Sequence, residues 1–226
     1  MISVIIPTLN AEEHLARTLA ALVPGAVEGL VREVIIADGG SRDGTRAIAE
    51  ATGCEFVSGA AGRGRQLAAG ARMARSGWLL FLHADTVPGE GWIGAVEDFI
   101  AAQGPRPGAA SFRFCLNASG ASPRILEQVV ALRCWLLALP YGDQGLLISR
   151  AHYDQIGGFA DIEIMEDVDI VRRIGRRRLS LLPVRAVTSA ERYRREGFSR
   201  RSIRNLACLS LYFLRVSPRL IARLYG

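Results

Sequence analysis

The chain has 226 residues, half of them hydrophobic, and a formal net charge of +6 at pH 7. This length fits one α/β domain, or one domain with an appendage, and the hydrophobic content excludes a chain that is disordered throughout. The first residues lack the features of a signal peptide, and no uncharged run reaches the roughly 18 residues that a membrane-spanning helix needs.

The four cysteines are widely spaced and form no C-x-x-C pair. This pattern favours free, buried thiols in a reducing compartment over a disulfide scaffold. We therefore expect a cytoplasmic protein.

The first half of the chain alternates short apolar strands with helical patterns. Strands are expected at 3–7, 34–38, 55–57 and 79–83, and helices at 11–23, at 45–53 and after the turn GRGR at 62–65. This alternation builds a parallel sheet, and in such sheets ligands bind beyond the carboxyl ends of the strands. We expect Thr8, Asn10, Asp38 and Asp85 to converge there, as side chains suited to a nucleotide diphosphate held through a divalent cation.

The second half is less regular and ends in a basic tail. Helices are predicted at 89–102, 123–139 and 167–174, and strands at 110–116 and 146–148. From 199 to 214 arginines accompany apolar residues at helical spacing, and a shorter pattern follows Pro218. Such a basic amphipathic helix can lie on a membrane, contact a second subunit or pack on the rest of the chain.

Several residues are candidates for chemistry, each with a structural alternative. Asp85 can bind Mg²⁺ or Mn²⁺ or cap a helix, and His83 can add an imidazole or be held by the backbone. Asp38 can accept from a ribose or a pyrimidine N–H, or form a turn. Glu166 and Asp167 either cap a helix or supply a general base. Arg63 and Arg65 can contact a diphosphate through their guanidinium groups.

Four segments together resemble a known family. VIIPTLN at 4–10, DGGSRDGT at 38–45, HAD at 83–85 and ED at 166–167 resemble, in order and spacing, family 2 glycosyltransferases of the GT-A fold. The likeness covers about residues 1–185. The HAD form and the GRGRQ turn at 62–66 are similar to a bacterial subgroup associated with arsenosugar biosynthesis.

The resemblance implies an α/β GT-A domain over 1–185, with a Rossmann-like, mostly parallel sheet flanked by helices, and a basic helical extension over 186–226. It also implies inverting transfer of a sugar, of the hexosyltransferase type, from a nucleotide-diphosphate donor to an acceptor hydroxyl. The donor would be a UDP-sugar, the cofactor Mn²⁺ or Mg²⁺, and the acceptor a small molecule or a lipid-linked group.

Carried over by position, the resemblance assigns Asp167 as the base with Glu166 beside it, and Asp85 with His83 at the metal. The acceptor would meet Asp143 and Gln144. The nucleotide-sugar would be bound by Pro7, Thr8, Asn10, Glu12, Asp38, Arg63, Arg65, His83 and Asp85. Two positions depart from the family pattern: His83 stands where an aspartate is usual, and Leu67 and Ala68 replace an Arg-Asn pair.

Two other functions are compatible with parts of the sequence. A nucleotidyltransferase-like enzyme shares the sheet architecture, but its glycine-rich G-x-G-x-R signature near the first strand is missing. A non-catalytic nucleic-acid-binding protein would fit the arginine excess, but it calls for aromatic residues among the basic ones. We expect no nucleic acid as a partner, while a homodimer and a peripheral contact with the inner face of the membrane stay open.

Overall fold

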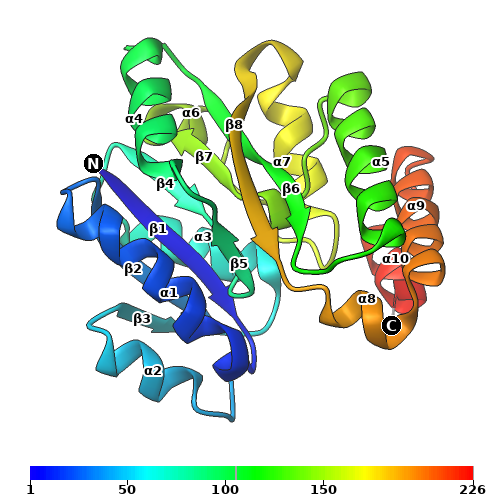
Figure 1. Cartoon of the computed structure of the whole chain (residues 1–226), viewed down its shortest axis with the longest axis horizontal. Coiled ribbons are helices and arrows are strands. Elements are labelled where there is room, and N and C mark those ends of the chain that lie inside the picture. Colours follow the sequence, from blue (N-terminus) through cyan, green and yellow to red (C-terminus); the bar gives the residue numbers. More distant parts are fainter. Residues whose placement is uncertain (105, 226) are drawn as a thin grey trace.

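The computed structural model describes residues 1–104 and 106–225 and shows an eight-stranded mixed sheet between two layers of helices (Figure 1). The strand order is β3-β2-β1-β4-β7-β6-β8-β5. This is the predicted α/β architecture, and its first half follows the predicted alternation of strands and helices.

The first half forms the parallel part of the sheet. β1 pairs in parallel with both β2 and β4, and β2 pairs in parallel with β3. The elements are β1 (Ile2–Thr8), α1 (Glu12–Val27), β2 (Val31–Asp38), α2 (Thr45–Ala51), β3 (Glu55–Ser58), α3 (Arg63–Met73) and β4 (Trp78–Phe81).

The second half adds the mixed part of the sheet and the C-terminal helices. β7 runs antiparallel to β4 and β6, β6 and β8 are parallel, and β5 is antiparallel to β8. The elements are β5 (Thr86–Pro88), α4 (Trp92–Gln103), β6 (Ala109–Leu116), α5 (Ala121–Leu137), the 3₁₀ turn η1 (Gly142–Gln144), β7 (Leu146–Ser149), α6 (Arg150–Gln155), α7 (Glu166–Ile174), the 3₁₀ turn η2 (Arg176–Arg178), β8 (Leu179–Thr188), α8 (Glu191–Glu196), α9 (Phe198–Phe213) and α10 (Pro218–Tyr225).

The two faces of the sheet carry separate hydrophobic clusters. On one face, α1 and α4 cover alternate residues of β1, β2 and β8. On the other, α3, α6, α7, α9 and α10 cover the remaining strand residues. Because the central strands are buried on both faces, they read as continuous apolar runs in the sequence.

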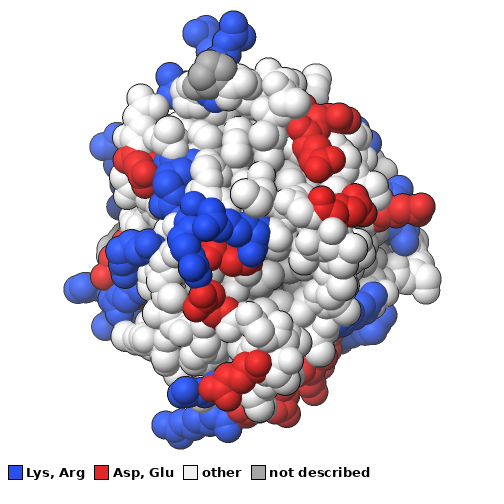
Figure 2. Space-filling model, turned by 90° about the vertical axis from the view of Figure 1, so that its left-hand side faces the viewer, with Lys and Arg blue, Asp and Glu red and all other residues white. Residues whose placement is uncertain are grey.

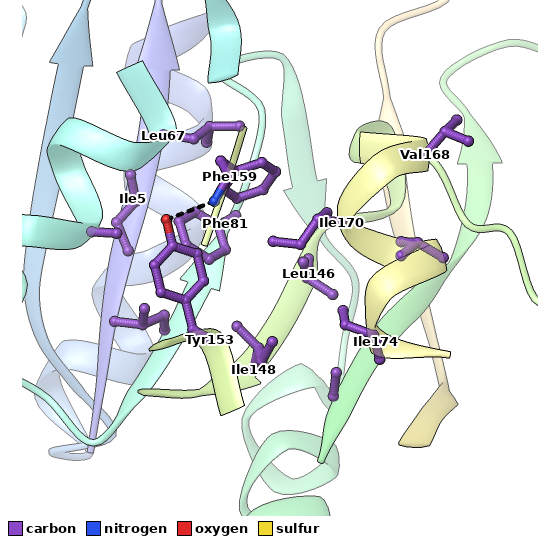
Figure 3. Close-up of a cluster of buried hydrophobic side chains, with 14 of the residues drawn as sticks. Ile5, Leu67, Phe81, Leu146, Ile148, Tyr153, Phe159, Val168, Ile170 and Ile174 are labelled. Atoms are coloured by element: carbon purple, nitrogen blue, oxygen red, sulfur yellow. Dashed lines mark hydrogen bonds between the residues drawn. The ribbon is translucent and has the colours of Figure 1, made fainter. Parts of the chain in front are cut away.

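Figure 3 shows the second of these clusters, in which Ile5 and Phe81 of the sheet meet Leu67 of α3 and Ile170 of α7. The ring of Phe81 packs edge-on against Phe159 at 4.8 Å between centroids. The buried hydroxyl of Tyr153 accepts a hydrogen bond from the Phe159 backbone N–H at 3.2 Å. This packing fixes the loop before α7, and with it the acidic residues at the start of that helix.

One local prediction is corrected. The GRGR segment was expected to be a turn, but Arg63 begins α3 and only Gly62 lies outside the helix. Asn10, just before α1, adopts a left-handed φ of 50°, and its side chain accepts a hydrogen bond from the Arg42 N–H. The loop after β1 is therefore tied to the loop after β2.

The basic tail packs on the sheet domain. The hydrophobic cluster that contains the strand residue Ile5 also includes Cys208, Leu209 and Ile221 of the tail. Of the three alternatives for the basic helices, packing on the rest of the chain therefore applies to the inner faces of α9 and α10. β8 runs through the predicted boundary at residue 185, and the division into 1–185 and 186–226 stays a prediction. Within the described residues, no helix is both long and apolar enough to span a membrane.

Candidate functional site

A cleft of about 530 Å³ opens beyond the carboxyl ends of β1 and β4. Its walls come from the loops after these strands, the start of α3, the start of α7 and the C-terminal helices. This volume lies in the range of small-molecule sites. The predicted residues that line it are Pro7, Thr8, Asn10, Arg63, His83, Asp85, Asp143, Glu166 and Asp167.

The ends of β1 and β2 are joined by a hydrogen-bonded turn around Asp38. The carboxylate accepts from the hydroxyls of Thr8 (2.9 Å) and Ser41 (2.5 Å) and from the N–H groups of Gly40 and Ser41. These bonds lower the pKa of Asp38 although burial opposes them. The side chain is ionised at neutral pH and all four of its acceptor positions are used.

His83 and Asp85 lie in the loop between β4 and β5. The pKa of His83 is lowered to about 4, chiefly by burial and then by Arg63 and Arg192, while the carboxylates of Asp85 and Asp167 oppose this shift. His83 is therefore neutral at pH 7 and has a lone pair to offer. Among the described residues, the Asp85 carboxylate has only a long 3.5 Å contact, with the Thr86 hydroxyl.

The start of α7 brings Glu166 and Asp167 to the cleft in different environments. Glu166 is buried, which raises its pKa, and it is paired with Arg63 at 3.1 Å. Asp167 accepts from the Gly142 N–H at 2.9 Å and from the Val168 N–H at 2.7 Å. The two bonds hold the Asp167 carboxylate at a fixed place on the cleft wall.

Asp143 adds a further carboxylate to the cleft. Burial raises its pKa to about 6; Arg133 and Arg63 oppose the shift, and the carboxylates of Asp167 and Asp85 add to it. Its Oδ1 is buried without a hydrogen-bond partner among the described residues. A buried acceptor of this kind is costly unless something pairs with it.

The donor types in the cleft suit a divalent cation. The carboxylates of Asp85, Asp143 and Asp167 and the neutral imidazole of His83 line it, and hard cations such as Mg²⁺ and Mn²⁺ bind oxygen ligands, with imidazole also acceptable to Mn²⁺. These donors are not drawn together into a preassembled cation site: among the described residues, the one group of three whose ligand atoms all lie within 4.8 Å of one another is Glu13, His14 and Glu191. A cation bound in the cleft would offset the burial and the weaker repulsion that raise the pKa of Asp143, and would pair with its Oδ1.

Four predicted site residues lie outside the cleft lining, because each is engaged within the protein. Glu12 accepts from the Gly44 N–H and Arg65 pairs with Asp161 at 2.5 Å. Gln144 is buried and donates to the Phe112 carbonyl at 2.9 Å. Asp38 lies beneath the strand ends, so contact with a nucleobase would require one hydroxyl to give up its bond.

Sequence reasoning missed several residues that line the cleft. Gln66 donates to the carbonyls of Thr8 (2.7 Å) and Ala37 (2.8 Å) and so ties the ends of β1 and β2 together. A second group of missed residues comes from the basic tail, which reaches the cleft only through tertiary packing; they are Arg192, Tyr193, Arg201, Asn205, Ala222 and Tyr225.

The missed arginines of the tail were visible in the sequence as a charge excess. Arg201 is buried against Glu196 at 2.7 Å and its guanidinium lies 5.1 Å from the Tyr193 ring centre. Arg192 is exposed at the cleft. With Arg63, these side chains form a basic part of the cleft lining, the positive wall, in which Arg63 is paired with Glu166 and Arg201 with Glu196.

Comparisons with known proteins agree on the fold. The chain is similar to glucosyl-3-phosphoglycerate synthase from Mycobacterium tuberculosis, at 20% identity and a TM-score of 0.55, covering 84% of this chain and 70% of that one. It is also similar to residues 1–349 of S. aureus TarS, at 16% identity and a TM-score of 0.62, covering 99% and 69%. A crystallised mycobacterial protein shares 22% identity at a TM-score of 0.58, covering 92% and 74%.

These likenesses show a GT-A-like fold. No curated protein matches the sequence. The narrower resemblance to the arsenosugar subgroup stays a prediction. Residues 3–110, which contain the turn around Asp38 and the HAD segment, match the family described as glycosyl transferase family 2. On this match, residues 3–110 belong to glycosyl transferase family 2, within a chain of GT-A-like fold.

Proposed function

We propose that the protein is an inverting, metal-dependent glycosyltransferase that moves a sugar from a UDP-sugar to an acceptor hydroxyl. The observation that carries this proposal is that Asp85, Asp143, Asp167 and neutral His83 line one cleft together with the arginines of the positive wall. The mycobacterial synthase was crystallised with Mn²⁺ and UDP, and TarS with UDP, which supports the choice of donor.

The positive wall is suited to the donor diphosphate. Arg63 and Arg192 can form charge-assisted hydrogen bonds with phosphate oxygens, and a cation held by Asp85 and His83 would neutralise charge on the departing diphosphate. The nucleoside would lie at the ends of β1 and β2, near Pro7, Thr8 and Asn10. Glu12, Asp38 and Arg65 then act by holding the surrounding loops.

Asp167 is the proposed general base. Its carboxylate takes the proton of the acceptor hydroxyl while the acceptor oxygen forms a bond to the anomeric carbon and the bond to the diphosphate breaks with its electron pair. One displacement of this kind inverts the anomeric centre. The Gly142 N–H positions Asp167, and Glu166 keeps Arg63 in place.

The acceptor would enter beside η1 and the C-terminal helices. Asp143 lies on this side of the cleft and can accept from a sugar or lipid-linked hydroxyl, whereas Gln144 supports η1 from below. The residues 186–226 are proposed as an extension that completes this side of the site.

The first test is thermal unfolding with UDP, GDP, dTDP and CDP, each with and without Mn²⁺. A ligand that binds only the folded state at about 100 times its Kd stabilises it by about 2.7 kcal/mol, which raises Tm by several degrees. We expect a Mn²⁺-dependent rise with UDP that Asp85→Asn abolishes.

The matched control is Asp98→Asn, the same chemical change at an exposed position on α4 outside the cleft. This variant should respond to UDP as the native chain does. If no nucleotide raises Tm in the presence of Mn²⁺, the donor site as proposed is wrong.

A further inference from the structure

Three helices on one side of the molecule expose apolar stripes. On α5, Ile125, Val129, Leu132 and Leu136 follow one another at spacings of four, three and four residues, so they share one face of the helix. Trp135 lies beside them and is 68% exposed. The chain thus displays large side chains that a helix normally turns inward.

The stripes of α9 and α10 continue this surface. α9 exposes Ile203, Leu206, Phe213 and Leu214, and α10 exposes Leu220 and Leu224. α5, α9 and α10 lie together at the same side of the fold, and α5 packs against α9 (Figure 1). We call the exposed apolar residues of these helices, with Trp135, the α5–α9–α10 face.

The charged side chains that α9 and α10 bring to this face have one sign. Residues 197–226 contain six arginines and no aspartate or glutamate, so the whole net charge of +6 resides there and the rest of the chain is neutral. Arg200, Arg215 and Arg223 are exposed and form no ion pair with any of the described residues. On the opposite side of the molecule, acidic and basic side chains lie next to each other (Figure 2).

We propose that the α5–α9–α10 face binds the surface of a bilayer that contains anionic lipids. Leucine, isoleucine and phenylalanine side chains enter the acyl boundary, tryptophan is favoured at the headgroup level, and arginines extend to the phosphates. Each arginine near an anionic surface adds attraction that salt weakens.

The charge also argues against a second copy of the chain as the occupant. In a twofold dimer the same patch meets itself, so the arginines of α9 and α10 would face the same arginines of the second copy. Like charges opposed in this way are unfavourable. An anionic surface has the complementary sign.

The same helices connect this face to the cleft. Arg201, Asn205, Ala222 and Tyr225 line the cleft from the inner sides of α9 and α10, while the outer sides carry the exposed apolar residues. Membrane binding would therefore bring the cleft close to the lipid surface. A cleft in that position would suit a lipid-linked acceptor. This suggestion about the acceptor rests on the proposed function, whereas the binding of the face to lipid does not.

Vesicle sedimentation tests the binding directly and needs no activity. The probes are vesicles of phosphatidylcholine alone and of phosphatidylcholine mixed with phosphatidylglycerol. We expect at least tenfold stronger partitioning to the anionic vesicles, reduced by raised salt. The double variant Leu206→Ser/Leu214→Ser should lower this partitioning at least tenfold, since two large apolar side chains no longer enter the lipid.

The matched control is Val23→Ser/Val27→Ser, which removes two exposed apolar side chains from α1. This variant should bind vesicles like the native chain. A blue shift of tryptophan fluorescence on binding, lost in Trp135→Phe, would locate the contact, because Trp78 and Trp92 are less exposed than Trp135.

Three outcomes would overturn the proposal. They are failure to bind either vesicle, equal loss of binding in the control variant, and a lipid-free dimer that Leu206→Ser/Leu214→Ser dissociates in sedimentation equilibrium. The last result would assign the face to a second copy of the chain. A failed nucleotide response with intact vesicle binding would instead count against the proposed function alone.

Discussion

Burial in the cleft sets the protonation states of its ionisable side chains, and the charges of neighbouring groups modify them. An added Cβ on Gly142 would lie 2.6 Å from His83 Nε2, so only glycine lets η1 approach this imidazole. The same backbone N–H holds Asp167. Burial keeps His83 neutral and Asp143 partly protonated near pH 6, and both effects depend on this close approach.

Asp143 makes folding stability depend on pH in a defined direction. Its pKa is 3.8 in the unfolded chain and about 6 in the folded one, so between these values only the folded state keeps the proton. This contribution to stability is complete below pH 3.8 and is lost as pH rises through 6. At pH 8 the free energy of unfolding of Asp143→Asn should therefore exceed that of the native chain by about 1 to 3 kcal/mol, and its urea midpoint should be higher.

The comparison is made by urea unfolding at pH 8 and at pH 4. The advantage of the Asn variant should nearly vanish at pH 4, because Asp143 is then protonated in the folded native chain. An advantage of the same size at both pH values would show that charge at Asp143 is not its cause. Added Mn²⁺ should narrow the difference at pH 8 by stabilising the native chain.

Asp167 is expected to affect the reaction rather than donor binding. Asp167→Asn keeps the size of the side chain but removes the base, and loss of general-base catalysis costs about 10² to 10⁴ in rate. UDP release from the best-bound UDP-sugar measures this loss. The UDP-induced rise in Tm should stay as in the native chain.

The control for this substitution is Asp169→Asn, two residues along the same helix, where the carboxylate pairs with Arg173 outside the cleft. Its rate of UDP release should stay within a few-fold of native. An unchanged rate in Asp167→Asn would remove Asp167 as the base.

At the scale of elements, prediction from sequence succeeded where local patterns decide the structure. The strands and helices up to β4 were found because apolar runs, glycine turns and helical spacing agree there. β8 was missed because Pro183 interrupts its pattern; the irregularity in its pairing with β6 lies opposite Ser111 to Arg113 and accommodates the proline.

Other misses have the same origin in tertiary structure. β5 has three residues and exists only through its pairing with β8, and no sequence period can reveal so short a strand. The cleft residues after β1, after β4 and at the start of α7 belong to motifs, whereas Asn205 and Tyr225 reach the cleft because α9 and α10 fold back on the sheet. The helical pattern of a basic segment does not show which of its faces packs on the sheet and which stays exposed, because that depends on the surface against which the helix folds.

The close packing of α3 on β1 predicts that a larger side chain at Gly70 destabilises the fold. A Cβ on Gly70 would lie 2.4 Å from Ile5 Cγ2, so Gly70→Ala must displace α3 from the sheet. We expect a loss of about 1 to 3 kcal/mol in the free energy of unfolding. The urea midpoint measures it, and UDP binding should weaken as well, since α3 carries Arg63 and Gln66 into the cleft.

Gly94→Ala in α4 is the matched control, because nothing lies within 4 Å of its added Cβ. A helix-interior alanine there should stabilise the protein by about 0.5 to 1 kcal/mol. The packing explanation fails if both substitutions shift the midpoint in the same direction and by the same amount.

At the scale of the whole molecule, the C-terminal helices belong to both the core and the cleft. Ile221 is fully buried in α10, and Ala222 and Tyr225 beside it line the cleft. Tyr225 also accepts from Arg201 at 3.3 Å. Detaching this helix should therefore damage stability and ligand binding together.

Ile221→Ser tests this link. Removing a fully buried isoleucine side chain should cost about 2 to 5 kcal/mol and lower Tm, and nucleotide affinity should fall with it. Leu224→Ser, three residues on and 64% exposed, should change stability in lipid-free buffer by less than about 0.5 kcal/mol. Equal effects of the two variants in thermal unfolding would show that α10 does not dock through Ile221.

The shared cluster of Ile5 and Ile221 also has a consequence for the order of folding. Contacts between the first strand and the last helix close a loop of nearly the whole chain, and such contacts form late because their entropy cost must be met first. At about 5 to 20 residues per second, synthesis takes roughly 10 to 40 seconds to pass from one residue to the other. During that interval the strand-end loops exist without their C-terminal wall, so we expect the nascent chain to acquire its ligand site only in its final stage of folding.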